Sequence, residues 1–121
     1  MFHTILIIGN LGSDPVMRYA GENPVTTLSV ASNRQYTSNG EKVKETTWFK
    51  VSVWGKQAES CNTYLKKGSS VLVEGELSPD KETGNPKTFT RSDGSTGASF
   101  DVTARTVRFL TGVEKQEEIP F

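Results

Sequence analysis

The chain has 121 residues with 14 basic and 14 acidic side chains, which gives a formal net charge of zero. This length suits one domain, and the apolar fraction of 34% favours a small β-rich domain with long polar loops over a thick α/β core. No apolar run is long enough to span a membrane, no signal peptide is evident, and the single cysteine, Cys61, excludes an intramolecular disulfide, so we expect a cytoplasmic protein.

The first half of the chain predicts strands joined by turns. An apolar, β-branched run at 2–10 predicts a buried strand, and after a glycine-rich turn the chain can return as a short strand at 16–19. Alternation of side-chain type predicts a second long strand at 25–36. The sequence Ser-Asn-Gly at 38–40 predicts a hairpin turn, and a third long strand follows at 43–54.

The third strand carries an unusual alternation. Its side chains point to two faces in turn, and one face is wholly apolar, as expected of a core side. The other face carries two tryptophans with a lysine between them, where charged and small polar groups are usual. Two flat π-surfaces beside a cation indicate a ligand with flat rings and negative charge, such as unpaired nucleic acid. The apolar face consists of Phe49, Val51 and Val53, and the other of Trp48, Lys50, Ser52 and Trp54.

The hydrophobic period changes after the third strand. Apolar residues at i, i+3 and i+7 predict a short helix over 56–67, with Gly68 as its C-cap. This apolar stripe consists of Ala58, Cys61 and Leu65. Cys61 is therefore most simply a small core residue.

Two further strands complete the predicted fold. They lie at 70–77 and 98–110, separated by a long polar hairpin at 78–97. Five strands with one helix between the third and the fourth predict an all-β, five-stranded OB-fold barrel. We expect residues 1–111 to form this domain and residues 112–121 to form a short acidic tail.

The sequence gives little support for catalysis or metal binding. His3 and Cys61 would have to meet a nucleophile or base by chance geometry, and no cluster has the spacing of zinc ligands. Gly55-Lys56 lacks the glycine pattern of a phosphate loop. We expect a protein that is not an enzyme and that needs no cofactor or metal.

Aromatic and basic residues together favour nucleic-acid binding. Alternatives remain open: Phe89 could anchor a loop to the barrel, the two tryptophans could be buried under a loop or in a subunit interface, and each cation could be a plain solvated charge. The candidates for base stacking are Trp48, Trp54, Tyr36 and Phe89. The candidates for phosphate contact are Lys50, Lys56, Lys66, Lys67, Arg18, Lys87 and Arg91.

Four motifs give the chain a specific resemblance. They are Ile8-Gly9-Asn10-Leu11-Gly12 with Asp14-Pro15 and Arg18-Tyr19, Trp48-Phe49-Lys50-Val51 with Trp54-Gly55-Lys56, Tyr64-Leu65-Lys66-Lys67-Gly68, and Val73-Glu74-Gly75-Glu76-Leu77. Over residues 4–110 the chain resembles the bacterial single-stranded DNA-binding protein (SSB) family. The resemblance implies an OB-fold, sequence-tolerant binding of single-stranded DNA and assembly as a homotetramer.

The resemblance also assigns roles to matching positions. Trp48 falls at a principal stacking tryptophan, Trp54 at a stacking phenylalanine and Tyr36 at another stacking tryptophan. Lys50, Lys56 and Lys67 fall at basic positions that contact the DNA backbone. Residues 78–85 depart from the family pattern where a further tryptophan is usual, which leaves Phe89 as the candidate replacement.

The tail resembles the acidic, phenylalanine-terminated tip with which such proteins recruit replication, recombination and repair enzymes. Its residues are Glu117, Glu118, Ile119, Pro120 and Phe121. The alternative for the tail is an inert solubilising terminus. For the whole protein the alternatives are an RNA-binding OB module, which would need to recognise the 2′-hydroxyl, and an assembly protein with buried tryptophans.

Charge adds one qualification. One basic and three acidic residues lie in 113–121, so the body without them has a net charge of only +2. A binder of nucleic acid is usually more basic, so the case depends on where the cations lie.

Overall fold

The structure, a computed structural model, describes residues 1–110 and contains seven strands and one helix within them. The elements are β1 (Ile5–Leu11), β2 (Val16–Ala20), β3 (Asn23–Ser38), β4 (Glu41–Trp54), α1 (Lys56–Tyr64), β5 (Ser70–Leu77), β6 (Lys87–Thr90) and β7 (Thr96–Phe109). The predicted tail, 112–121, lies outside the described residues. No helix within residues 1–110 is long and apolar enough to cross a membrane.

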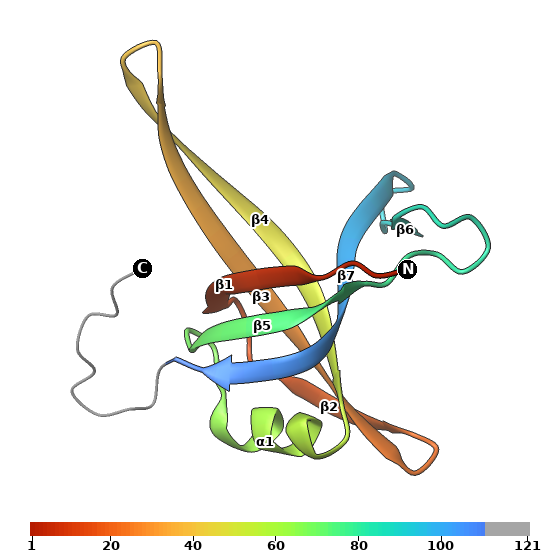
Figure 1. Cartoon of the computed structure of the whole chain (residues 1–121). Helices are drawn as coiled ribbons and strands as arrows, with labels where there is room; N and C mark the ends of the chain where they lie inside the picture. The colour runs from red at the N-terminus through yellow and green to blue at the C-terminus, as the bar shows by residue number, and fades with distance from the viewer. Residues whose placement is uncertain (111–121) are drawn as a thin grey trace.

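Five of the strands close into a barrel (Figure 1). They follow the order β1-β5-β7-β4-β3, and β1 completes the circle because it pairs with β5 over most of its length and with β3 at Asn10 and Leu11. The pairs are antiparallel except for β4 with β7, which is parallel. The helix α1 lies between β4 and β5, the third and fourth strands of the barrel, so the predicted OB-fold is confirmed.

The barrel interior holds the apolar faces of its strands. On β4, Val51 and Val53 are fully buried and Phe49 packs against the core, as the alternation predicted. The helix lies across one end of the barrel (Figure 1), where the buried Thr26 hydroxyl donates a hydrogen bond of 2.7 Å to the Ala58 carbonyl oxygen. The predicted stripe of Ala58, Cys61 and Leu65 is buried.

The seam between β1 and β3 depends on a close backbone approach. A Cβ atom added at Gly9 would lie 2.2 Å from the Ala31 carbonyl oxygen, and backbone at a strand pairing cannot retreat without breaking the pairing. Glycine at this position therefore lets β1 bend across to β3 and close the barrel.

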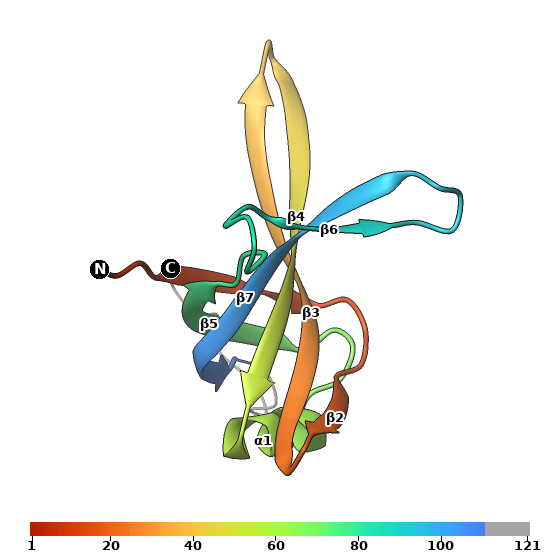
Figure 2. The same cartoon turned by 90° about the vertical axis from the view of Figure 1, so that its right-hand side faces the viewer.

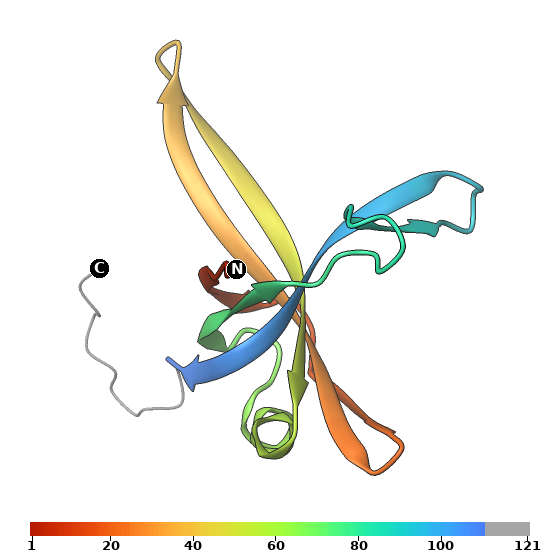
Figure 3. The same cartoon turned by 45° about the vertical axis from the view of Figure 1, so that its right-hand side comes forward.

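Two arms extend away from the barrel. The β3–β4 hairpin pairs from Val25–Trp54 up to Ser38–Glu41, two residues beyond the predicted end of each strand, and turns at Asn39-Gly40 with positive φ. The second arm consists of β6 and the first part of β7. Figures 2 and 3 show the two arms splayed apart on the side of the barrel opposite α1.

Three local predictions need correction. The helix ends at Tyr64, and Gly68 is not its cap; Gly68 has φ 94° in the following turn and donates its N–H to the Leu11 carbonyl oxygen at 2.8 Å. The polar hairpin contains a strand, β6, because β7 begins early enough to pair with it. The strand predicted at 2–10 starts at Ile5, and only alternate residues of β1 are buried.

Candidate nucleic-acid interface

The strand register brings distant residues onto one face. Cross-strand partners share a face, and Ala31 pairs with Trp48, Ser29 with Lys50, and Lys50 with Asp101 on β7. The β2–β3 and β6–β7 pairings extend this surface at both sides, and we call it the binding face. Its members are Val16, Arg18, Thr27, Ser29, Ala31, Trp48, Lys50, Ser52, Trp54, Lys87, Phe89, Ser99 and Asp101.

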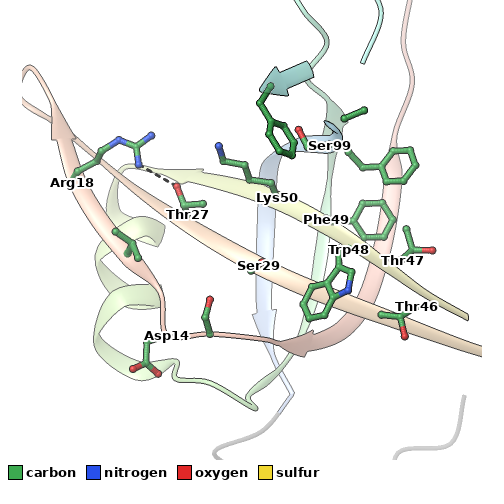
Figure 4. A pocket seen from close by; sticks show the side chains of 15 residues that line it. Asp14, Arg18, Thr27, Ser29, Thr46, Thr47, Trp48, Phe49, Lys50 and Ser99 are labelled. Carbon is green, nitrogen blue, oxygen red and sulfur yellow. Dashed lines mark hydrogen bonds between the residues drawn. The ribbon is translucent and has the colours of Figure 1, made fainter. Parts of the chain in front are cut away.

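A groove of about 720 Å³ opens over the binding face. Figure 4 shows Arg18 and Thr27, Trp48 and Lys50, and Ser99 contributed by separate strands around it. Phe89 also lines the groove. An open groove lined by aromatic rings and cations suits a strand whose bases and phosphates are both accessible.

Trp48 presents a supported aromatic surface. The side chain is 52% exposed, and its ring packs so closely on Gly12 that a Cβ atom there would lie 2.5 Å from ring atom Cζ3. Gly12 is held in turn by a 2.9 Å hydrogen bond from its N–H to the Ser29 carbonyl oxygen. The indole is thus backed by the protein backbone while half of its surface faces solvent. Trp54, 45% exposed, lies on the same face at the end of β4.

Phe89 is held on its own arm and also faces the groove. Its ring lies over Gly97, where an added Cβ atom would come within 2.6 Å of it. The Arg91 guanidinium lies 5.4 Å from the ring centroid and donates hydrogen bonds to Ser95 Oγ and to the Thr96 carbonyl oxygen. The ring is thus anchored on its own arm and not on the barrel, and it remains 48% exposed.

The predicted cations differ in where they lie relative to the groove. Arg18 and Lys50 line the groove, and Arg18 donates a 3.4 Å hydrogen bond to the Thr27 hydroxyl (Figure 4). Lys87 lies on the binding face but is paired with Asp101 at 3.7 Å. The lysines at the start of α1 and in the turn after it are exposed but do not line this groove; they are Lys56, Lys66 and Lys67.

Tyr36 lies on the opposite face of the β3–β4 arm. Its partner is Val43, and strand alternation places both on the side away from Trp48. There the Arg34 guanidinium covers the Tyr36 ring at 5.0 Å and forms a 2.9 Å ion pair with Glu45. The structure therefore does not bring Tyr36 together with the other stacking candidates.

Two cations on the binding-face side were missed by the sequence analysis. Lys42 pairs with Thr37 and Lys44 with Gln35, so both lie on the side of the arm that carries Trp48. The signal was available, because counting back from Trp48 in steps of two reaches both lysines. They extend the basic surface toward the tip of the arm.

Two titratable side chains outside the binding face have shifted pKa values. Burial raises the pKa of the Cys61 thiol to about 11, as expected for a core residue. Hydrogen bonds from Ser95 lower the pKa of Asp93 in the turn after β6. Within the part of the chain that the structure describes, no three His, Cys, Asp or Glu residues are grouped as metal ligands.

Known proteins resemble the chain over almost its whole length. The profile of the single-strand binding protein family matches residues 2–110. The chain is 35% identical over 119 residues to single-stranded DNA-binding protein 2 of Chlorobaculum tepidum, covering 96% of this chain and 76% of that one. It is 38% identical over 112 residues to a single-stranded DNA-binding protein of Caldanaerobacter subterraneus subsp. tengcongensis, covering 91% and 69%.

Solved structures agree with the fold. The small single-stranded DNA-binding protein from Streptomyces coelicolor superimposes with a TM-score of 0.73 at 23% identity, covering 88% of this chain and 93% of that one. A deletion mutant of the single-stranded DNA-binding protein from Thermus aquaticus gives 0.67 at 24% identity, covering 91% and 51%.

Proposed function

We propose, from the premise that this chain belongs to the single-strand binding protein family, that it binds single-stranded DNA with little sequence preference. The observation that supports this most directly is the half-exposed Trp48 indole, backed by Gly12 and next to Lys50 in an open groove. A base stacked on such a ring contributes about 1–3 kcal/mol whatever its identity, because every base has a π-face.

The binding face suggests a division of roles. Trp48, Trp54 and Phe89 would stack bases, and Lys50 and Arg18 would neutralise phosphates. Stacking of bases on these aromatic side chains favours unpaired DNA or RNA over a duplex, since it requires bases that are not already paired. The alternative of an RNA-binding module is tested by competition between oligo-dT and oligo-U, and equal affinity for the two would count against a dedicated DNA role.

Tryptophan fluorescence tests the central proposal. Addition of oligo-dT should quench the emission strongly, because both tryptophans lie half-exposed on the binding face. Comparing Trp48→Phe with Trp54→Phe assigns the quenching to each ring. Absence of quenching at saturating DNA would refute stacking and favour an assembly protein. Repeating the titration at two salt concentrations counts the phosphate contacts, with a log–log slope of about −0.7 for each.

We extend the proposal to replication, recombination and repair, with partner enzymes recruited by the tail. Phe121 offers an aromatic ring, Pro120 limits the backbone entropy lost on docking, and Glu117 and Glu118 would steer toward basic pockets. Deleting Phe121 should abolish recruitment of a partner enzyme and leave DNA affinity intact. Unchanged recruitment would refute the role of the tail.

We also propose that the protein acts as a homo-oligomer, with a tetramer as the expected state. Leu6 and Ile8 on the outer side of β1 are 63% and 40% exposed. Among the described residues, β1 pairs with β3 only at Asn10 and Leu11, so the rest of that edge has no strand partner. Light scattering should give about four times the mass of one chain. A monomeric mass, unaltered by Leu6→Glu, would contradict the proposal.

A further inference from the structure

The Asp101 carboxylate lies on the binding face beside two candidate phosphate contacts, Lys87 and Lys50. Asp101 on β7 is the register partner of Lys50 on β4, so the two side chains leave neighbouring strands, about 4.8 Å apart, on the same face. One Asp101 oxygen lies 3.7 Å from the Lys87 ammonium, and the other accepts a hydrogen bond from the Ser99 hydroxyl. Asp101 is thus ion-paired with one candidate phosphate contact, Lys87, and lies across the strand pairing from a second, Lys50.

The exposure of these groups differs in a way that matters for DNA. The Asp101 side chain is 12% exposed, whereas that of Lys87 is 46% exposed. An incoming phosphate can therefore reach Lys87. Water cannot fully screen the negative charge of Asp101 from that phosphate, because the Asp101 side chain is mostly covered. The phosphate meets a lysine whose charge is already partly neutralised, and Lys50 carries the same negative neighbour.

We propose that Asp101 sets the affinity of this face for single-stranded DNA, as an internal anion that competes with DNA phosphates for Lys87 and lowers the positive potential at Lys50. This inference rests on the proposed function. Binding then depends more on the aromatic rings than on charge, which favours strands with unpaired bases over other polyanions. The Asp101–Lys87 ion pair is long, at 3.7 Å, and its lysine is 46% exposed, so the pair itself contributes little to stability.

The variant Asp101→Asn isolates the charge. Asparagine has nearly the same shape and can still hydrogen-bond to Ser99, so the arm should keep its structure. The matched control is Glu82→Gln, which removes one negative charge from an exposed turn between β5 and β6 that does not line the groove. Thermal unfolding checks that both variants fold as the wild type does.

The readout is oligo-dT affinity as a function of salt. Asp101→Asn should bind about three- to eightfold more tightly at low salt, from a unit charge about 7 Å from a phosphate at an interface of intermediate dielectric. Its log–log salt slope should steepen by about 0.7, the value for one additional phosphate contact. Glu82→Gln should change affinity less than twofold.

A double-mutant cycle keeps the inference testable if Asp101→Asn alters the arm. Lys87→Gln should weaken binding more in the Asp101→Asn background than in the wild type, because Lys87 is released there for phosphate contact. Wild-type binding with no gain in Asp101→Asn and no coupling to Lys87 would overturn this inference and leave the proposed function intact. Failure of the wild type to bind oligo-dT would overturn both.

Discussion

Replacing Gly12 with alanine would add a methyl group where the Trp48 indole now lies. The new carbon would be 2.5 Å from ring atom Cζ3 and 2.6 Å from Cη2, whereas carbon atoms in ordinary contact are about 3.5–4.0 Å apart. The far end of the ring must therefore retreat by about 1 Å or more. It can do so because the side chain is 52% exposed.

The cost should appear in DNA binding and not in folding. A half-exposed ring that can tilt into solvent loses far less than an overpacked core, so we expect a change in unfolding free energy below about 1 kcal/mol. The displaced indole, however, no longer offers a backed surface to a base. The loss of binding is bounded by the stacking of one base, about 1–3 kcal/mol, or roughly 5- to 150-fold in Kd.

The assay measures three quantities on the same samples: oligo-dT affinity by fluorescence anisotropy, the tryptophan emission spectrum, and thermal unfolding. Asn62→Ala, on the exposed side of α1 and outside the groove, is the control and should bind like the wild type. A folded Gly12→Ala protein with wild-type affinity would refute the argument that Gly12 positions Trp48 for stacking. A large loss of stability would show that the clash is not absorbed by the ring.

Three further outcomes are expected. Tyr36→Ala should weaken oligo-dT binding less than twofold while Trp48→Ala weakens it by about 1–3 kcal/mol, and equal losses in the two titrations would show that DNA contacts both faces of the arm. Gly9→Ala should destabilise the fold by about 3 kcal/mol or more in urea unfolding, because its Cβ would meet the Ala31 carbonyl oxygen at 2.2 Å; a wild-type midpoint would contradict the seam argument. Burial raises the pKa of Cys61 from 9.0 to about 11, so the thiol stabilises the fold below pH 9 and this contribution is lost as the pH rises toward 11; rapid labelling of the folded protein by a thiol reagent at pH 8 would be inconsistent with that burial.

Much of the architecture could be predicted because it depends on the regular spacing of apolar residues within single strands and helices. Alternation along β4 separated the core side, with Val51 and Val53, from the side with Trp48, and both assignments are confirmed by burial. The i, i+3, i+7 stripe likewise predicted which side of α1 is buried. Where local signals compete with tertiary contacts, prediction was wrong: Gly68 has the positive φ of a cap, but its N–H bonds to β1 and not to the helix.

Prediction of the binding face required more than the alternation of side chains along one strand. Lys42 and Lys44 share the alternation of Trp48 and could have been found by the same count. Tyr36 could be assigned by the same count, because it lies six positions after the buried Val30 and therefore on the same side of β3; the pairing of β3 with β4 adds that this side lies away from Trp48. The partnership of Lys50 with Asp101, 51 positions along the chain, exists only because β4 and β7 run side by side in the barrel.

The sequence by itself therefore determined which residues of each strand face the core, where the helix lies, and that two tryptophans and a lysine are displayed together. The tertiary structure alone decided which displayed residues share one groove, that Gly12 backs the Trp48 ring, and that an aspartate pairs with Lys87 and lies across from Lys50. The physical reason is that side-chain alternation is a property of one strand, whereas register and barrel closure are set by contacts between residues far apart in the chain.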